Sequence, residues 1–162
     1  KQMGNRVISI LGARDKSRMI LEDRFAEISD ELIVCTDDGS HGRKALVTEP
    51  LKEVCSRDPT PDHAFVIGPT PMMKFCCEAT RPFGVPTQVS LNTIMIDGTG
   101  MCGGCRVEVG GKAKFVCVDG PEFDGHQVNF DLMIKRLGAY KKLEQQAYED
   151  YKQHKCRIGL HG

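Results

Sequence analysis

The first 92 residues alternate between short apolar runs and stretches with helical spacing, and this alternation limits the possible folds most strongly. Apolar runs at 7–11, 31–36 and 64–67 each stop at a glycine or an aspartate, as buried strands of a parallel sheet do. A fourth run at 87–91 follows the same pattern. Residues with helical spacing separate the runs, at 17–26, 50–54 and 71–80. Strands that alternate with helices predict an α/β fold with a parallel sheet covered on both faces.

Charge and hydrophobicity narrow the class of protein. Among the 162 residues, 22 Lys and Arg balance 22 Asp and Glu, so the chain has no basic surface suited to nucleic acid or to an anionic membrane. No apolar run approaches the length of a membrane-spanning helix. We therefore expect a cytoplasmic protein that has neither nucleic acid nor a membrane as its partner.

Three loops follow the expected strands and carry the residue types of a nucleotide site. They lie at 12–15, 36–40 and 68–71 and are rich in glycine, proline and short polar residues. Ligands of parallel sheets bind beyond the carboxyl ends of the strands, where these loops lie. Ordinary strand-to-helix turns explain the same composition equally well, so both interpretations remain open at this point.

A glycine-rich loop after residue 93 carries four residues of metal-ligand type. Four, two and eleven residues separate successive members of the set Asp97, Cys102, Cys105 and Cys117. This is the spacing of plant-type ferredoxins, with aspartate in place of the first cysteine. Glycines in the loop permit positive φ angles and a close approach of the backbone, at Gly98, Gly100, Gly103 and Gly104.

A hairpin is expected to complete the ligand set. Gly110 and Gly111 separate the strand-like runs 106–109 and 112–116, which is a hairpin signal. The hairpin returns Cys117 toward Cys102 and Cys105. An iron–sulfur cluster is favoured over zinc, because structural zinc sites usually have two short cysteine pairs and this chain has one. Asp97 has two open interpretations, a ligand or a turn residue before glycine.

The other five of the eight cysteines are scattered through the chain, at Cys35, Cys55, Cys76, Cys77 and Cys156. We expect buried thiols in a reducing cytosol, with disulfides or additional ligands as the less favoured interpretation.

These motifs closely resemble one family of electron-transfer subunits. The stretches that carry the resemblance are 90–106, 117–124, 11–14, 36–40 and 67–73. They are similar to the small electron-transfer subunit of NADH-dependent reduced ferredoxin:NADP oxidoreductase, also named sulfide dehydrogenase beta subunit, and to the electron-transfer subunit of dihydroorotate dehydrogenase. The resemblance covers essentially the whole chain, and the loop from Asp97 to Cys105 is its most specific part.

The resemblance implies a fold, cofactors and a partner. The family has an FAD-binding barrel, a ferredoxin-reductase-type NAD-binding domain and a domain that holds a 2Fe–2S cluster. NADH gives hydride to FAD, and electrons pass singly through the cluster to a larger flavoprotein subunit or in reverse. The implied domains are a partial NAD-binding domain at 1–92, an iron–sulfur domain at 93–130, and a C-terminal helix and tail at 131–162.

The resemblance also implies site residues. The bifurcating branch of the family holds its cluster with one aspartate and three cysteines, which correspond to Asp97, Cys102, Cys105 and Cys117. Residues near the nicotinamide end of NAD(H) would be Gly68, Pro69 and Met72. Residues near its adenosine end would be Gly12, Ala13, Arg14, Asp37 and Asp38; a solvated surface arginine and turn-capping aspartates remain the open alternatives for the last three.

Two parts of the family's fold have no counterpart in these 162 residues. One is the FAD barrel, and the other is the first strand of the nucleotide domain, which would lie between the strands at 6–11 and 63–67. The resemblance therefore implies a C-terminal fragment that is inactive without the FAD domain and binds NAD(H) weakly or not at all. Another copy or a partner is then a candidate to complete the sheet.

The last part of the chain reads as one amphipathic helix over 131–153. Its apolar residues recur every three or four positions, at Leu132, Met133, Leu137, Tyr140, Leu143 and Ala147. We expect this helix to pack against the protein, with docking on the large subunit as the alternative. The polar end at 154–162 is expected to be frayed.

Overall fold

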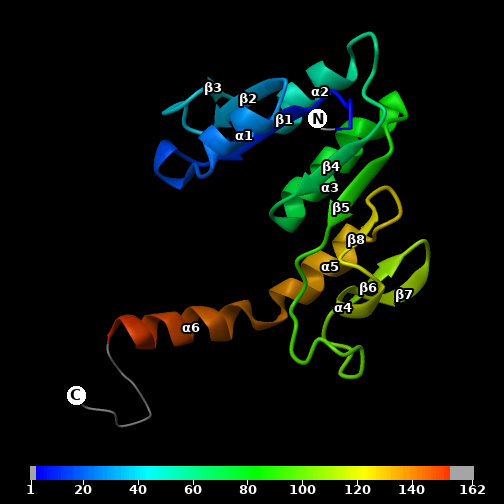
Figure 1. The fold of residues 1–162 in the computed structure, drawn as a ribbon. Coiled ribbons are helices and arrows are strands. Elements are labelled where there is room, and N and C mark those ends of the chain that lie inside the picture. The colour runs from blue at the N-terminus through cyan, green and yellow to red at the C-terminus, as the bar shows by residue number, and fades with distance from the viewer. Residues whose placement is uncertain (1–2, 154–162) are drawn as a thin grey trace.

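The computed structural model describes residues 3–153 (Figure 1); the predicted frayed end lies outside this range. The first half contains β1 (Ile8–Ala13), α1 (Glu22–Ile28), β2 (Glu31–Thr36), β3 (Arg43–Lys44), α2 (Thr48–Cys55), β4 (Ala64–Ile67), α3 (Thr70–Thr80) and β5 (Thr87–Ser90). The second half contains β6 (Arg106–Val109), β7 (Lys112–Phe115), α4 (Val116–Asp119), β8 (Glu122–Asp124), α5 (Phe130–Leu137) and α6 (Lys141–Lys152). Short 3-10 turns are η1 (Lys16–Arg18), η2 (Arg81–Phe83) and η3 (Gly138–Tyr140).

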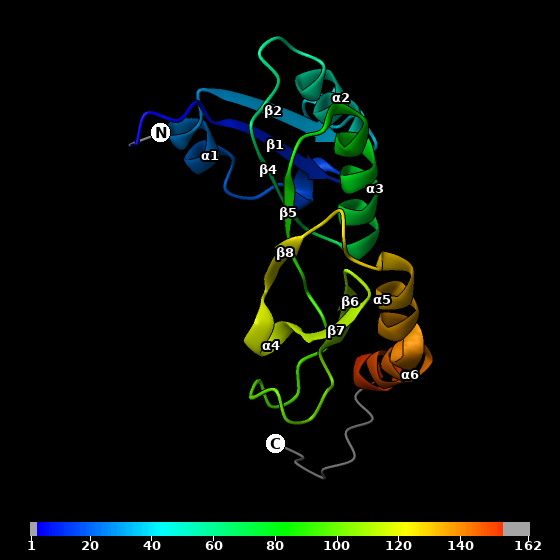
Figure 2. The same cartoon turned by 90° about the vertical axis from the view of Figure 1, so that its right-hand side faces the viewer.

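Two of the three small sheets are built on parallel pairs, and the third is the antiparallel pair β6-β7. Of the first two sheets, one has the order β1-β2-β3 and the other has the order β4-β5-β8 (Figures 1 and 2). β1 pairs with β2 in parallel, and β4 pairs with β5 in parallel, so the predicted α/β class and parallel pairing are confirmed. Within residues 3–153 no hydrogen-bonded strand pair joins β1 to β4, which is where the resemblance implies that the first strand is missing; that missing strand remains a prediction.

One face of β4 is not covered by the part of the chain that the structure describes. Side chains alternate along a strand, so Val66 lies in the core with α3 while Phe65 and Ile67 lie on the opposite face. Phe65 is 69% exposed and Ile67 is 75% exposed. The prediction that helices cover both faces of the sheet is therefore wrong at β4. The strand is apolar on both faces, as the sequence shows, but Phe65 and Ile67 on the second face remain exposed.

A single apolar core joins α3 to the second half of the chain. Met73 of α3 is fully buried and shares this core with Val107 and Val116 of the hairpin region and with Met133 of α5. α2 packs against α3, and its Leu51 contacts the core. Because Cys105 belongs to the same core, the cysteine loop is attached to the body of the protein rather than to a separate unit.

Four of the scattered cysteines are buried free thiols, as predicted: Cys35, Cys55, Cys76 and Cys77. Burial raises the pKa of Cys76 to about 11 and that of Cys77 to about 12, so both remain protonated at neutral pH. Cys156 lies outside the described residues.

Two predicted helices are interrupted. The stretch 17–26 divides into η1 and α1, because Leu21 has a left-handed backbone with φ 59°. The stretch 131–153 divides into α5, η3 and α6 at Gly138, a residue with low helix propensity. The prediction that this whole segment packs on the protein is wrong, since α6 has no buried residue and extends away from the sheets (Figure 1).

The segment after residue 93 also contributes to the sheet of the first half. β8 pairs antiparallel with β5, with Val89 opposite Phe123. The division at 92 and 130 therefore crosses a hydrogen-bonded sheet, and it remains a prediction. None of the helices in residues 3–153 is long and apolar enough to cross a membrane.

Candidate metal centre

The hairpin places two of the candidate ligands beside each other. β6 and β7 are paired from Arg106 opposite Phe115 to Val109 opposite Lys112, and both turn glycines have positive φ. Cys105 directly precedes β6, and Cys117 lies in α4 directly after β7. Their Sγ atoms are 3.3 Å apart. The predicted hairpin is thus confirmed, and it brings these two thiols into contact.

The two thiols influence each other's ionisation. Burial acts to raise the pKa of Cys105, but hydrogen bonds with the amide and thiol of Cys117 outweigh burial and lower it. The hydrogen bond with Cys105 raises the pKa of Cys117. The pair therefore favours one thiolate beside one thiol, and the thiolate is the form that binds metals.

Asp97 caps the turn at the start of the cysteine loop. Its Oδ1 accepts from the Thr99 amide at 2.9 Å, and its Oδ2 accepts from the Cys102 amide at 3.2 Å. The Thr99 hydrogen bond is the main reason that the pKa of Asp97 is lowered. The turn-forming role is therefore present, and it also keeps an ionised carboxylate next to Cys102.

Cys102 is exposed, and the loop backbone approaches its sulfur. The Gly104 amide donates to Cys102 Sγ at 3.4 Å. Gly98, Gly100 and Gly103 have the predicted positive φ angles, of 74°, 82° and 67°. Gly104 does not, so that part of the prediction is wrong. A Cβ at Gly104 would instead lie 3.2 Å from Ile96 Cδ1, so this glycine serves a close approach.

The four candidate ligands form two pairs, Asp97 with Cys102 and Cys105 with Cys117. Within residues 3–153, no three His, Cys, Asp or Glu side chains lie close enough together to hold a single metal ion. A tetrahedral zinc ion needs its donors around one centre, whereas a two-iron cluster distributes four protein donors over two irons. The three sulfurs and one carboxylate lie in two pairs beside a glycine-rich backbone. This arrangement fits the two-iron cluster.

The first candidate nucleotide loops lie side by side at the carboxyl ends of β1 and β2. The Asp37 amide donates to the Ala13 carbonyl at 3.1 Å, and the Asp38 amide donates to the Arg14 carbonyl at 3.2 Å. Asp38 Oδ1 accepts from the hydroxyl and amide of Ser40, and the hydroxyl contact is the main cause of its lowered pKa. Asp38 therefore caps its turn, while Arg14 is exposed.

Gly12 lies beside these loops, at a position that requires a small residue. A Cβ there would be 2.1 Å from Val47 Cγ1, so the absence of a side chain allows the segment after β3 to pack on β1.

The remaining nucleotide candidates lie on the second sheet. Pro69 precedes α3, and Met72 in its first turn approaches Gly68, where a Cβ would be 2.5 Å from Met72 Cε. The Asn92 side-chain Nδ2 donates to the Gly68 carbonyl at 3.5 Å, and the Thr70 hydroxyl donates to Asn92 Oδ1 at 3.1 Å. The structure therefore assembles two groups of candidates, one on each sheet.

Two residues near these sites have no distinguishing signal in the sequence. Asn92 links the Gly68 loop to the start of the cysteine loop. Arg136 of α5 donates to the Gly104 carbonyl at 3.4 Å. Arg136 follows Lys135 in a charged helix, and residue type and spacing alone do not distinguish a solvated arginine from one that reaches a loop 32 residues earlier.

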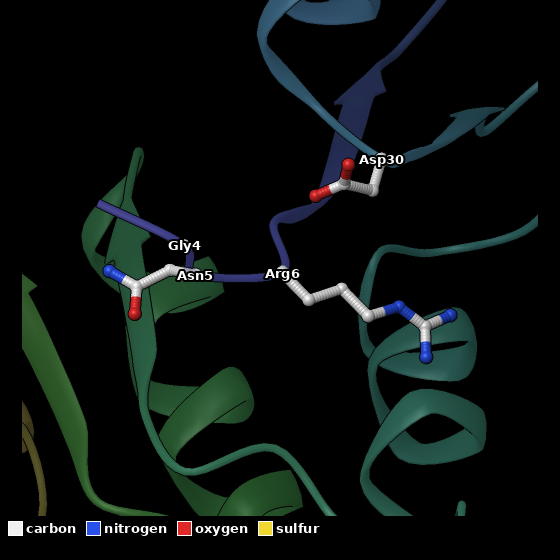
Figure 3. A pocket seen from close by; sticks show the side chains of 4 residues that line it. All are labelled: Gly4, Asn5, Arg6 and Asp30. Carbon is white, nitrogen blue, oxygen red and sulfur yellow. The ribbon is translucent and has the colours of Figure 1, made fainter. Parts of the chain in front are cut away.

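A hollow of about 430 Å³ lies away from these candidates. It is lined by Gly4, Asn5, Arg6 and Asp30 (Figure 3). These residues precede β1 and β2, so they lie at the amino ends of the strands. Ligands of parallel sheets bind at the opposite ends, and the hollow is therefore not the expected nucleotide site.

Comparisons with known proteins support an iron–sulfur site at the cysteine loop. Residues 92–129 match the family model of the iron–sulfur cluster binding domain of dihydroorotate dehydrogenase B. A Thermotoga maritima protein described as a homolog of the electron transfer subunit of dihydroorotate dehydrogenase B (NAD(+)) is 52% identical over 151 residues, which are 93% of this chain and 53% of the relative. The probable electron transfer subunit of that enzyme from Methanocaldococcus jannaschii is 40% identical over 141 residues, 87% of this chain and 52% of the relative.

A solved structure agrees as well. It is described as the NADH-dependent reduced ferredoxin-NADP oxidoreductase structure, in connection with flavin-based electron bifurcation, and it superposes with a TM-score of 0.81 at 50% identity. The superposition covers 93% of this chain and 54% of that one. The chain thus spans about half the length of the relatives it matches. The resemblance stated from the sequence is confirmed: the chain is similar to electron transfer subunits of dihydroorotate dehydrogenase B and to a chain of the reduced ferredoxin–NADP oxidoreductase.

Proposed function

We propose that the chain carries single electrons through a 2Fe–2S cluster held by Asp97, Cys102, Cys105 and Cys117. The observation that carries the proposal is the arrangement of these donors in two pairs, three of them on the glycine-rich loop and Cys117 after the hairpin, inside the segment that matches an iron–sulfur binding domain. When bound, such a cluster takes up and releases one electron at a time.

The residues around the loop have separate tasks. Asp97 and Cys102 would hold one iron, and Cys105 and Cys117 would hold the other. The Gly104 amide, which donates to Cys102 Sγ, stabilises negative charge on that sulfur and so favours the reduced state. The shared core around Cys105 keeps one ligand pair fixed while the exposed Cys102 remains close to the protein surface.

The larger reaction is that of an NAD(P)H-dependent flavin oxidoreductase. The relatives are named electron transfer subunits, and we infer a larger flavoprotein as the partner of this chain. NAD(H) would contact Gly12, Ala13, Arg14, Asp37, Asp38, Gly68, Pro69 and Met72. FAD would belong to the part of the subunit outside these 162 residues, and the fragment would be inactive without it. The free thiols of the described residues suit a cytoplasmic location.

A further strand would make the nucleotide site continuous. Among residues 3–153, β1 and β4 each have one edge without a strand partner, and α2 packs against α3. Exposed edges pair readily with another strand. We propose that a parallel strand lies between β1 and β4, with covering structure over Phe65 and Ile67, and that it comes from further polypeptide or from a second copy.

Metal analysis tests the cluster. After anaerobic reconstitution with iron and sulfide, we expect about two irons and two sulfides per chain, as a 2Fe–2S cluster requires. Cys105→Ser should lose most of this iron, whereas the matched control Cys55→Ser, at a buried cysteine outside the loop, should retain it. One zinc per chain with no visible absorbance would refute the proposal and identify a zinc-stabilised module.

A further inference from the structure

Helix α5 is anchored in the core and places Arg136 beside the cysteine loop. Phe130 and Met133 anchor the helix in the core, and the Asn129 side chain accepts from the Leu132 amide at its start. From the last turn of this helix, Arg136 Nη2 donates to the Gly104 carbonyl.

Lys74 of α3 adds a second attachment for α5, through an ion pair of 2.7 Å with Asp131. The base that presents Arg136 is thus joined both to the core and to α3. Arg136 is half-buried, so its position is set by packing and not only by solvent.

The contact lies within the proposed ligand set. Gly104 is between Cys102 and Cys105 in the chain, and its amide donates to Cys102 Sγ. The same residue therefore accepts from Arg136 on one side and donates to a ligand sulfur on the other. Removal of the guanidinium would free the Gly104 carbonyl, and the backbone rotation this permits at Gly104 would alter the hydrogen bond of the Gly104 amide to the sulfur.

The charge of Arg136 is not neutralised by a carboxylate. Within residues 3–153 it forms no ion pair. Asp119, two residues after Cys117, is occupied by the Phe115 amide at 2.7 Å and by Lys114 at 3.7 Å. Arg136 therefore supplies a positive charge to the Gly104 side of the loop.

We propose that Arg136 is a positioning residue that fixes the Gly104 carbonyl and raises the reduction potential of the cluster. This inference rests on the cluster proposed above. One-electron reduction adds one negative charge to the cluster, and a nearby cation stabilises that charge by Coulomb attraction. The electron comes from the external reductant, and no bond to Arg136 forms or breaks.

A redox titration monitored by EPR tests the role of Arg136. The reconstituted chain is titrated with dithionite as wild type, Arg136→Gln, Arg136→Lys and Lys135→Gln. At a fixed potential, we expect Arg136→Gln to lower the ratio of reduced to oxidised cluster about threefold. For a one-electron couple a tenfold change in this ratio is about 59 mV, so the midpoint potential should fall by about 28 mV. Arg136→Lys keeps the charge and should recover most of the shift.

Lys135→Gln is the matched control, because it removes the same charge from the same helix turn at an exposed position. Its midpoint should equal that of wild type. Equal midpoints for Arg136→Gln and Lys135→Gln would overturn the inference, although iron and sulfide analysis would still support the cluster. If the wild-type chain binds no cluster, both proposals fail.

Cluster loss in the variants is also informative. Loss in Arg136→Gln with retention and a wild-type midpoint in Arg136→Lys would support the positioning role. Suppose that Arg136→Gln and Arg136→Lys both lose the cluster while their circular dichroism stays that of wild type. The positive charge of Lys would then not be sufficient to keep the cluster, and this result would overturn the proposal that the charge of residue 136 tunes the reduction potential.

Discussion

Met133 gives the sharpest test of the shared core that supports the cysteine loop. Its side chain is 2% exposed and lies in the same core as Cys105. Met133→Ala removes three heavy atoms beyond Cβ, worth about 2.4 kcal/mol at about 0.8 kcal/mol per buried group. The cavity adds to this, so we expect the free energy of unfolding to fall by about 3 kcal/mol, within the range of about 2–5 for such changes.

Leu143→Ala is the matched control. It also removes three heavy atoms beyond Cβ, but Leu143 lies on α6 and is 68% exposed. Such a surface substitution should change the free energy of unfolding by no more than about 0.5 kcal/mol. Urea denaturation of both metal-free variants, followed by circular dichroism, measures the two values.

Cysteine accessibility shows whether the effect reaches the loop. Cys105 is 3% exposed, so in Met133→Ala it should become open to alkylation at a lower urea concentration than in wild type. If Met133→Ala costs no more than Leu143→Ala, or if Cys105 protection is unchanged, then the hairpin and α5 do not share one core and the reasoning is refuted.

Three further predictions concern ligands and titration. Asp97→Cys should keep the cluster but change its spectrum and midpoint, because thiolate replaces a harder oxygen donor; unchanged spectra would show that Asp97 is not a ligand. Arg57 donates to both carboxylate oxygens of Glu31 and is the main cause of the lowered pKa of Glu31. The pair therefore stabilises the fold fully at pH values above 4.5, the ordinary pKa of a glutamate, and this stabilisation is lost as the pH falls through the lowered pKa. Arg57→Gln should therefore flatten the pH dependence of urea stability in that acidic window, and an unchanged slope would contradict the assignment. In the metal-free chain, iodoacetamide at pH 8 should label the exposed Cys102 and leave Cys76, whose pKa is raised to about 11, unmodified in mass spectra; equal labelling would contradict the burial of Cys76.

The sequence predicted local structure well where a short-range signal exists. Strand runs that stop at glycine, such as that before Gly68, and the Gly110–Gly111 turn correspond to observed elements, because strand burial and turn geometry depend on neighbouring residues. The helix breaks at Leu21 and Gly138 were missed. A left-handed leucine has no sequence signal, and the isolated glycine did not outweigh the regular apolar spacing around it.

Long-range arrangement was harder to predict. The sequence indicated four ligand-type residues, but the pairing of Asp97 with Cys102 through a backbone amide depends on the turn that the loop adopts. Exposure of α6 was not predictable from its spacing, since an amphipathic pattern shows which side chains could be buried and not whether a surface covers them. The contact of Arg136 with Gly104 depends on how α5 packs, which no local pattern encodes.

The number of electrons that the reconstituted chain accepts tests the central claim most directly. A stoichiometric dithionite titration, with integration of the EPR signal at each step, counts electrons and spins per chain. A 2Fe–2S cluster at Asp97, Cys102, Cys105 and Cys117 should take up about one electron per two irons and give about one unpaired spin. A reconstituted chain that takes up no electron and gives no signal would contradict the claim.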